Sequence, residues 1–136
     1  MKNALFLTVG VCLLAGMAVP VMAQSGGVML RGEVPFDFVS ANRSIPAGQY
    51  SIEIGQLQVR IKGANGNPVQ VVLSNPRHQD GNGGKPRLVF HKYGDTYFLH
   101  QIWTADYKVE FRISRAEYNL KASLQTDEDT VILAMR

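Results

Sequence analysis

Residues 50–62 read YSIEIGQLQVRIK, and their apolar and polar side chains alternate almost without a break. A period of two is typical of a β-strand with one buried face and one face in water. Gly55 interrupts the pattern near its middle, and a two-residue turn at 55–56 with a positive φ at Gly55 would fold the stretch into a hairpin. The predicted cross-strand pairs are Ile54 with Leu57, Ile52 with Val59, and Tyr50 with Ile61. The face in water would hold Ser51, Glu53, Gln58, Arg60 and Lys62.

The same alternation continues on both sides of this hairpin. Upstream, EVPFDFV at 33–39 contains Pro35, which removes one ladder hydrogen bond and favours an edge strand or a bulge. Downstream, 69–73 and 107–113 keep the period, and TVILAMR at 130–136 is expected to be a terminal strand that closes or extends the sheet. These segments predict an all-β fold, a small antiparallel sandwich or barrel of about eight strands.

One segment, SRAEYNLKASL at 114–124, changes from the strand period to a helical period. Ser114 and Glu117 have the spacing of a capping box, in which the hydroxyl accepts from the N3 amide and the carboxylate accepts from the N-cap amide. Apolar side chains recur every four residues and would give the helix one apolar stripe. The stripe consists of Ala116, Leu120 and Leu124. We therefore expect one short helix in the C-terminal half of the chain.

The N-terminal segment has the pattern of a secretory signal peptide. Residues 1–23 combine Lys2 in a short positive start, an apolar run, and a small-residue cleavage site that ends at Ala23. The apolar run is short for a membrane span of ~20 residues, and we expect no transmembrane segment in the mature chain. Cys12, the only cysteine, lies inside this segment, so the mature chain would have no disulfide and no thiol. We expect a signal peptide over 1–23, a single β-rich domain over 24–136, and a secreted or periplasmic location.

Residues 91–100, HKYGDTYFLH, contain two of the three histidines of the chain. A two-residue turn at 94–95 would pair Lys92 with Tyr97, His91 with Phe98, and Val89 with His100. His91 and His100 would then be diagonal neighbours on one face, with Cα atoms roughly 7 to 8 Å apart. Two such imidazoles could begin a zinc or copper site, but a closed site needs further ligands, so we assign no metal. This register places Val89, Phe98 and Ile102 on the histidine face, and Leu88, Phe90, Leu99 and Trp103 on the other.

Aromatic side chains gather in the same part of the chain and are the candidate ligand contacts. A small barrel or sandwich can hold an apolar or sugar ligand against such rings, although the same residue types commonly fill cores. The candidate set is Tyr93, Tyr97, Trp103 and Tyr107, together with His91 and His100.

Enzymatic chemistry has no motif in this sequence. A Gly-x-Ser-x-Gly elbow, a phosphate-binding glycine loop and a His-Glu-x-x-His helix are all absent. Glu53 and Glu110 alternate with core residues and are expected in solvent, while Glu117 is expected to cap its helix. The net charge is +3, and no basic run is dense enough to favour nucleic-acid binding. We therefore assign no catalytic residue and no cofactor.

Several motifs together resemble those of one protein family. PFDF at 35–38, SIPAGQY at 44–50, LVFHKYGDTYFLHQIW at 88–103 and SRAEYNL at 114–120 occur in this order. The combination is similar to an uncharacterised family of short secreted bacterial proteins with Pro-Phe-x-Phe, Leu-Pro-Ala-Gly-x-Tyr, Tyr-Gly-Asp-x-Tyr-Phe-Leu with a following Trp, and Ser-Arg-x-Glu motifs. Ile45 stands where that family usually has leucine. The resemblance implies a secreted β-rich domain and carries no known activity.

Three functions are therefore considered, in order of expectation. The first is a non-enzymatic secreted or periplasmic β-domain that acts by binding or structural association. The second is a carrier of a small apolar or aromatic ligand in a barrel mouth, and the third is a metal-dependent or hydrolytic enzyme centred on His91 and His100. The sequence identifies no specific partner. The class of partner that we consider is a protein or another component of the cell envelope. An enclosed cavity lined by Tyr and Trp would favour the carrier, whereas a filled core with an exposed apolar strip would favour the interaction module.

Overall fold

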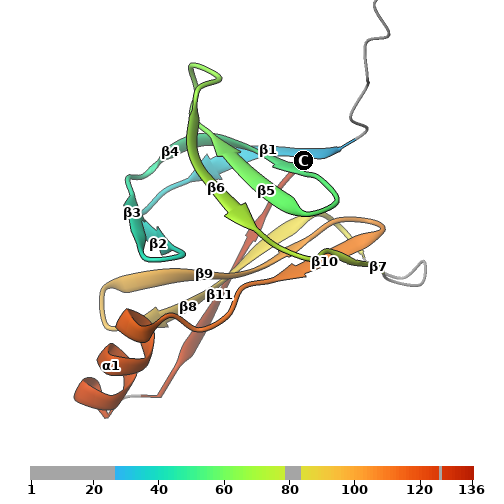
Figure 1. Cartoon of the computed structure of the whole chain (residues 1–136). Coiled ribbons are helices and arrows are strands. Elements are labelled where there is room, and N and C mark those ends of the chain that lie inside the picture. Colours follow the sequence, from blue (N-terminus) through green and yellow to red (C-terminus); the bar gives the residue numbers. More distant parts are fainter. Residues whose placement is uncertain (1–26, 79–83, 126) are drawn as a thin grey trace, which may run out of the picture.

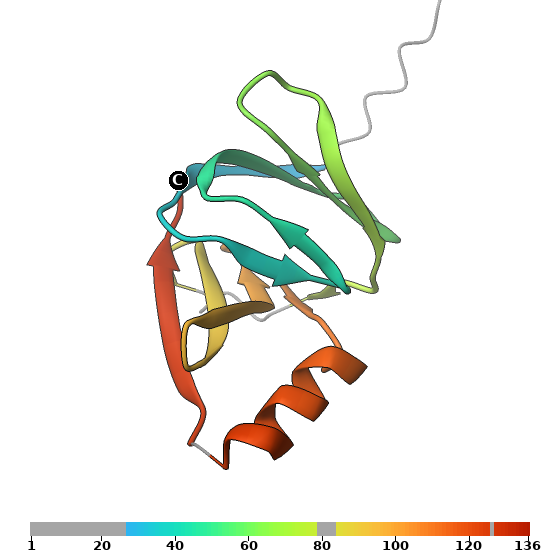
Figure 2. The same cartoon turned by 90° about the vertical axis from the view of Figure 1, so that its left-hand side faces the viewer.

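Two β-sheets face each other in the computed structural model, which describes residues 27–78, 84–125 and 127–136 (Figure 1; Figure 2). The all-β prediction is confirmed in its sandwich form, because the sheets formed by the described residues do not close into a barrel. The predicted signal peptide at 1–23 lies outside the described residues. Within the described ranges, no helix is long and apolar enough to cross a membrane.

The first sheet is a four-stranded antiparallel sheet with the order β1-β4-β5-β6. Its inward side chains alternate with solvated ones, as the sequence period requires. Its strands are β1 (Val28–Val34), β4 (Gly48–Ile54), β5 (Gln58–Lys62) and β6 (Pro68–Leu73).

The second sheet contains seven strands, most of them antiparallel. Five strands follow the order β11-β8-β9-β10-β7, and a short β2–β3 hairpin joins them through a parallel pairing of β2 with β9. The strands are β2 (Phe38–Ser40), β3 (Arg43–Ile45), β7 (Arg77–His78), β8 (Arg87–Tyr93), β9 (Thr96–Trp103), β10 (Tyr107–Glu110) and β11 (Asp129–Ala134).

The β4–β5 hairpin keeps the predicted faces but not the predicted register. Ile54 lies opposite Val59 rather than Leu57, so the connection is longer than two residues, and Gly55 is not among the glycines with a positive φ. The shift equals one full strand period, so it leaves every side chain on its predicted face. Leu57, which was expected to pair inside the hairpin, lies in the connection and is 71% exposed.

The β8–β9 hairpin has the predicted two-residue turn, in which Gly94 adopts a φ of 59°. Lys92 pairs with Tyr97 and His91 with Phe98, as expected. The register then shifts between Val89 and Phe90, because β9 contains one extra residue and forms a bulge. The predicted pairing of Val89 with His100 is therefore wrong, since Val89 lies opposite Gln101. Beyond the bulge, Ile102 is fully buried opposite Leu88, and Trp103 lies opposite Arg87.

The core between the sheets is filled by apolar side chains from both layers. Burial of this apolar surface is the main stabilising term for a chain without disulfides. The core includes Leu30, Ile52, Val59 and Ile61 from the first sheet and Leu88, Phe90, Leu99, Ile102 and Val109 from the second.

One side of the sandwich is joined and the opposite side is open. Beyond β11, Arg136 and Arg31 of β1 exchange backbone hydrogen bonds of 2.7 and 3.0 Å, so the end of the chain connects the two sheets. The terminal segment therefore both extends the second sheet and closes one side, as Figure 1 shows for the red strand. On the other side, β6 is the edge of the first sheet, and β10 with the short β7 is the edge of the second.

The single helix of the described residues, α1 (Arg115–Leu124), begins at the predicted N-cap Ser114. The Ser114 hydroxyl accepts a hydrogen bond of 3.1 Å from the Glu117 amide, so this half of the capping box is confirmed. The predicted apolar stripe is wrong, because Ala116 and Leu124 are exposed. The buried helical residue is Glu117, whose side chain turns toward the second sheet instead of remaining at the helix end.

Candidate binding site

Three of the six residues predicted to contact a ligand lie together beneath α1. His91 and Tyr93 of β8 and His100 of β9 occupy the face of the second sheet that α1 covers. A shared face for the two histidines was expected only if the turn had two residues; the turn has two, and the rings stack with centroids 3.8 Å apart and planes inclined by 28°. We call this group, with Glu117 and Glu128, the His91 cluster.

The imidazole of His91 lies between two carboxylates. Its Nδ1 is 2.8 Å from Oε1 of Glu117, and its Nε2 is 3.0 Å from Oε1 of Glu128. A neutral imidazole has one donor nitrogen, so the ring donates to both carboxylates only when it is protonated. The ring therefore lies within hydrogen-bond distance of α1 through Glu117 and of the segment before β11 through Glu128.

The remaining donors of the cluster also point at these carboxylates. The Tyr93 hydroxyl donates to Glu117 and Glu128 at 3.1 Å each, and Lys121 of α1 donates to Glu128 at 3.0 Å. Partial burial opposes ionisation of Glu128, but the hydrogen bonds from Lys121 and Tyr93 outweigh it and lower the pKa of this carboxyl. Burial, together with the two nearby carboxylates, raises the pKa of the Tyr93 phenol well above its ordinary value.

The second histidine of the cluster has an environment that favours its neutral form. Burial lowers the pKa of His100, and the adjacent His91 lowers it further. Glu110 lies 3.9 Å from its Nε2 and opposes this shift only in part. In the stacked pair, His91 lies between two carboxylates, whereas His100 has a pKa below its ordinary value.

The His91 cluster is closed to ligands by its own contacts. His91 is 7% exposed and Glu117 is 4% exposed, and both ring nitrogens of His91 already face carboxylate oxygens. Among the described residues, no group of three or more His, Cys, Asp or Glu side chains is arranged to hold a metal ion. The geometry gives the cluster a structural role, which is to fasten α1 and Glu128 to the second sheet.

Each of the other three aromatic candidates contacts a different set of side chains, and none of these contacts is with the cluster. Tyr97 stacks on Phe36 with centroids 3.9 Å apart and packs against the core. The Trp103 ring contacts the guanidinium of Arg87 at 4.2 Å and the ammonium of Lys108 at 5.0 Å, which are its cross-strand neighbours. Tyr107 contacts His78 edge to face. The six candidates therefore do not form one ligand site.

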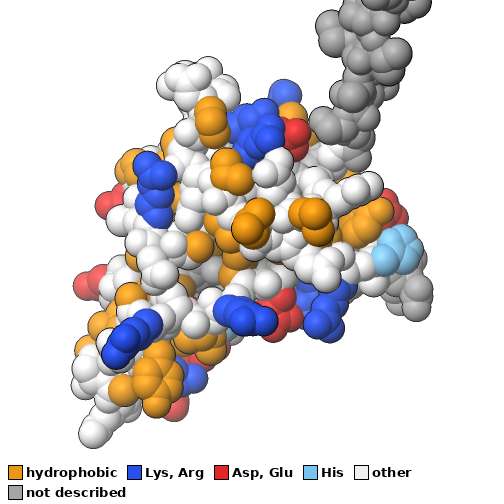
Figure 3. All heavy atoms as spheres, in the orientation of Figure 1, with side chains coloured by type: hydrophobic (Ala, Val, Ile, Leu, Met, Phe, Trp, Pro, Cys, Tyr) orange, Lys and Arg blue, Asp and Glu red, His pale blue; other side chains and the backbone are white. Residues whose placement is uncertain are grey.

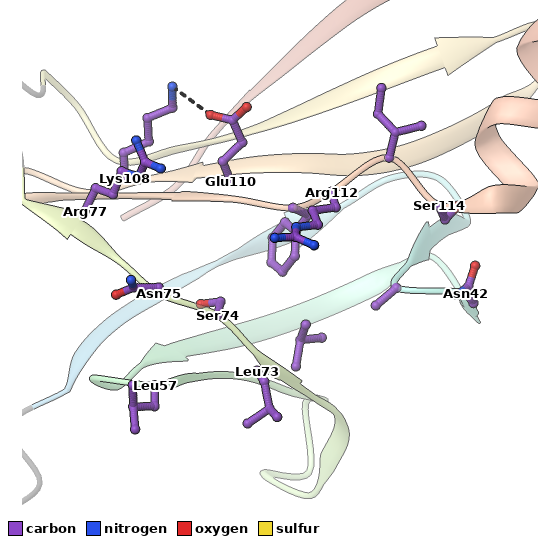
Figure 4. A pocket seen from close by; sticks show the side chains of 14 residues that line it. Asn42, Leu57, Leu73, Ser74, Asn75, Arg77, Lys108, Glu110, Arg112 and Ser114 are labelled. Atoms are coloured by element: carbon purple, nitrogen blue, oxygen red, sulfur yellow. Dashed lines mark ion pairs between the residues drawn. The ribbon is translucent and has the colours of Figure 1, made fainter.

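A groove of about 1130 Å³ runs along the open side of the sandwich, and no residue of the candidate set lines it. Figure 4 shows its two walls, with Leu73, Ser74 and Asn75 along one and Glu110, Arg112 and Ser114 along the other. The first wall continues β6, and the second joins β10 to α1. Asn42, in the turn between β2 and β3, lies near the Ser114 end.

The groove and its rim carry exposed apolar side chains. Leu73 is 84% exposed, Leu57 is 71% exposed and Ile113 is 48% exposed, while Val71 of β6 is also largely exposed. Figure 3 shows apolar side chains gathered on this face, with basic side chains below them. An apolar strip bordered by charged side chains is typical of a surface that binds another molecule.

The groove and the role of Glu117 were not predicted from the sequence. The uncharged run VQVVL at 69–73 was a possible signal for the groove, because an exposed edge strand without charge is unusual in a soluble domain. Glu117 had a complete local explanation as a capping residue, and its partner His91 lies 26 residues away. No family model, no curated protein and no solved structure matches this chain.

Proposed function

We propose that this protein is a non-enzymatic β-domain that acts by binding another macromolecule in the groove between β6 and the segment 110–114. The observation that carries the proposal is the combination of a filled core with an exposed apolar groove. Leaving several large apolar side chains in water is unfavourable, and covering them with a partner removes that cost. The groove lies where the two sheets separate, so a partner can reach both walls.

The geometry supports an interaction module over a small-molecule carrier. A carrier pocket normally encloses most of its ligand, whereas this groove is only partly enclosed. Its walls do not include Tyr93, Tyr97, Trp103 or Tyr107, the rings on which the carrier hypothesis depended.

Secretion is part of the proposal and depends on the sequence. The pattern at 1–23 supports export to the periplasm or medium, and the resemblance to short secreted bacterial proteins agrees with it. A binding surface facing an extracellular or envelope partner is consistent with both.

Photo-crosslinking from inside the groove tests this function. A photoreactive phenylalanine analogue replaces Leu73 in one version of the full chain and Tyr118 in another, and both are expressed in the cell that makes the protein. Both side chains are highly exposed, but Tyr118 lies on α1 and does not line the groove. We expect discrete crosslinked proteins from position 73 and none of the same species from position 118.

Two results would overturn the proposal. Identical products from both positions, or none from position 73, would mean that the groove is not a selective binding surface. Native mass spectrometry of the protein purified from its own compartment distinguishes the interaction module from the carrier. A retained small organic molecule would favour the carrier.

A further inference from the structure

The outer edge of β6 is an unprotected strand edge. Among the described residues β6 pairs only with β5, and its segment 69–73 contains no charged side chain and no proline. Soluble proteins usually protect such edges with a charge, a proline or a bulge that points outward. Pro68 and Pro76 flank this run, and the one register shift with β5 falls at Val69, next to Pro68. The middle of β6 therefore remains available for pairing.

The hydrogen-bond pattern shows which backbone groups face this edge. Ser74 donates to the carbonyl of Leu57 at 3.0 Å, and antiparallel pairing alternates, so Val72 also directs its backbone groups to β5. Val71 and Leu73 then direct their N–H and C=O groups outward. Four consecutive residues, 72–75, line the groove. Side chains of a strand alternate between its two faces, so consecutive lining residues indicate that the edge of the strand, rather than one of its faces, borders the groove. The Ser74 hydroxyl is buried there without a partner in the described part of the chain.

The opposite wall carries a positive charge. Among the described residues, the groove is lined by the bases Arg77, Lys108 and Arg112 and by one acid, Glu110. Glu110 pairs with Lys108 at 3.2 Å, which leaves a net excess of arginine. The nearby cations lower the pKa of Glu110, led by the hydrogen bond from Lys108 despite slight burial, so this acid stays ionised and paired. The field in the groove therefore favours an anionic ligand.

We infer that the groove binds an extended acidic peptide segment of another protein, which pairs with the edge of β6 as an additional strand. This inference rests on the function proposed above and specifies its partner. Backbone groups of Val71 and Leu73 would hydrogen-bond the added strand, while apolar side chains at alternate positions would cover Leu57 and Leu73. Acidic side chains at the intervening positions would face Arg77 and Arg112. A second copy of this chain fits less well, because it would bring an equally basic groove against the first.

Synthetic peptides test this inference directly. The probe is a short capped peptide of alternating leucine and glutamate, and its controls replace glutamate by lysine or insert a central proline. We expect the acidic peptide to bind the mature protein and to slow amide exchange at Val71 and Leu73. Both control peptides should bind at least about tenfold more weakly, because one loses the charge match and the other loses strand pairing.

Two matched pairs of variants separate the backbone contribution from the charge contribution. Val71→Pro removes one outward N–H, whereas Val71→Thr keeps it and changes the side chain to a similar extent. Arg112→Gln removes a groove cation, whereas Arg31→Gln removes a cation from the joined side of the sandwich. We expect Val71→Pro and Arg112→Gln each to weaken peptide binding about tenfold. Their partners should leave binding near the wild-type value, and circular dichroism checks that all four variants fold.

The outcomes also separate this inference from the broader function. If Val71→Pro and Val71→Thr bind equally, or if the lysine peptide binds as well as the acidic one, strand addition by an acidic segment is wrong. A dimer in sedimentation experiments, or crosslinking of position 73 to a second copy, would overturn the inference in favour of self-association. Failure of every peptide while position 73 still crosslinks a foreign protein would reject this partner class and leave the groove as a binding surface.

Discussion

The His91 cluster and the groove distribute polar and apolar groups in opposite ways. In the cluster, charged side chains are buried, and His91, Glu117 and Tyr93 point their polar atoms at one another. In the groove, Leu57 and Leu73 are exposed, and a strand edge has no partner among the described residues. A satisfied polar network gives a region one defined arrangement, whereas exposed apolar surface with free backbone groups is available to a partner.

The two regions are also connected along the chain. Ser114 lines the groove and caps α1, and Glu117 stands one helical turn later in the His91 cluster. The groove wall at 110–114 is thus held by β10 at one end and by the cluster at the other. The cluster therefore holds in place a wall of the groove that a partner would contact.

The largest effect on stability is expected at His91. Replacing His91 by alanine leaves the buried Glu117 carboxyl group with the Tyr93 hydroxyl as its remaining partner in the cluster, and removing one partner of a buried polar group costs about 1 to 3 kcal/mol. Urea unfolding followed by tryptophan fluorescence measures the loss. The control is His78→Ala, because His78 is exposed, and this variant should stay within about 0.5 kcal/mol of wild type. A loss below about 1 kcal/mol for His91→Ala would show that the cluster does not fasten α1.

A smaller loss is expected at the helix N-cap. Ser114→Ala removes the hydroxyl that accepts from the Glu117 amide, and N-cap replacements of this kind cost about 1 kcal/mol. The matched control is Ser123→Ala, because the Ser123 hydroxyl is exposed and donates to a carbonyl within the same helix. Denaturant midpoints of the two variants provide the comparison, and equal midpoints would contradict a capping role.

The faces of the β4–β5 hairpin were predictable, whereas the faces of β9 beyond its bulge and the detailed registers of both hairpins were not. Alternation from Tyr50 to Ile61 assigns each side chain to a face, and an even shift in register leaves that assignment unchanged. The bulge at His100 adds one residue without a distinctive sequence mark, and it moves Ile102 into the core and Trp103 onto the histidine face. Local periodicity therefore predicts which surfaces exist but not where a strand irregularity inverts them.

The candidate site was less predictable because it depends on contacts between distant segments. The stacking of His91 and His100 follows from one local hairpin, and it was predicted as a shared face. The burial of Glu117 requires knowing that α1 folds back over β8. The groove requires knowing that β6 becomes an edge, which depends on the order of strands in the sheet. Sequence patterns report periods within a segment, whereas these features depend on tertiary topology.

The cluster should also make stability fall as the solution is acidified. The pKa of His100 is lower in the folded state than its ordinary 6.5, so the unfolded chain binds more protons as the pH falls below that value. Stability is then fully present above about pH 6.5 and declines toward the folded-state pKa. The groups facing His100 are His91, Glu110, Glu117 and Glu128, and the lowered pKa of Glu128 adds a further loss below 4.5.

Thermal unfolding between pH 7 and pH 5 measures the histidine part of this effect. We expect the melting temperature to fall over that range in the wild type and to fall less in His100→Gln, which has no proton to gain there. His78→Gln is the control, since this exposed histidine lies outside the cluster. A wild-type slope unchanged by His100→Gln would show that another group titrates in its place.

The smallest effect on stability, together with the clearest effect on binding, is expected at Leu73. Its side chain is 84% exposed, so Leu73→Ser removes little buried surface and should change the free energy of unfolding by no more than about 0.5 kcal/mol. The same substitution removes the most exposed apolar side chain of the groove and should weaken binding of the acidic peptide. Ile132→Ser is the matched control, because Ile132 is 63% exposed on β11, outside the groove. Urea unfolding measures the stability of both variants, and peptide titration measures their binding. If Leu73→Ser were clearly destabilised, or if both variants bound the acidic peptide equally well, the groove would belong to the packed structure rather than to a binding surface.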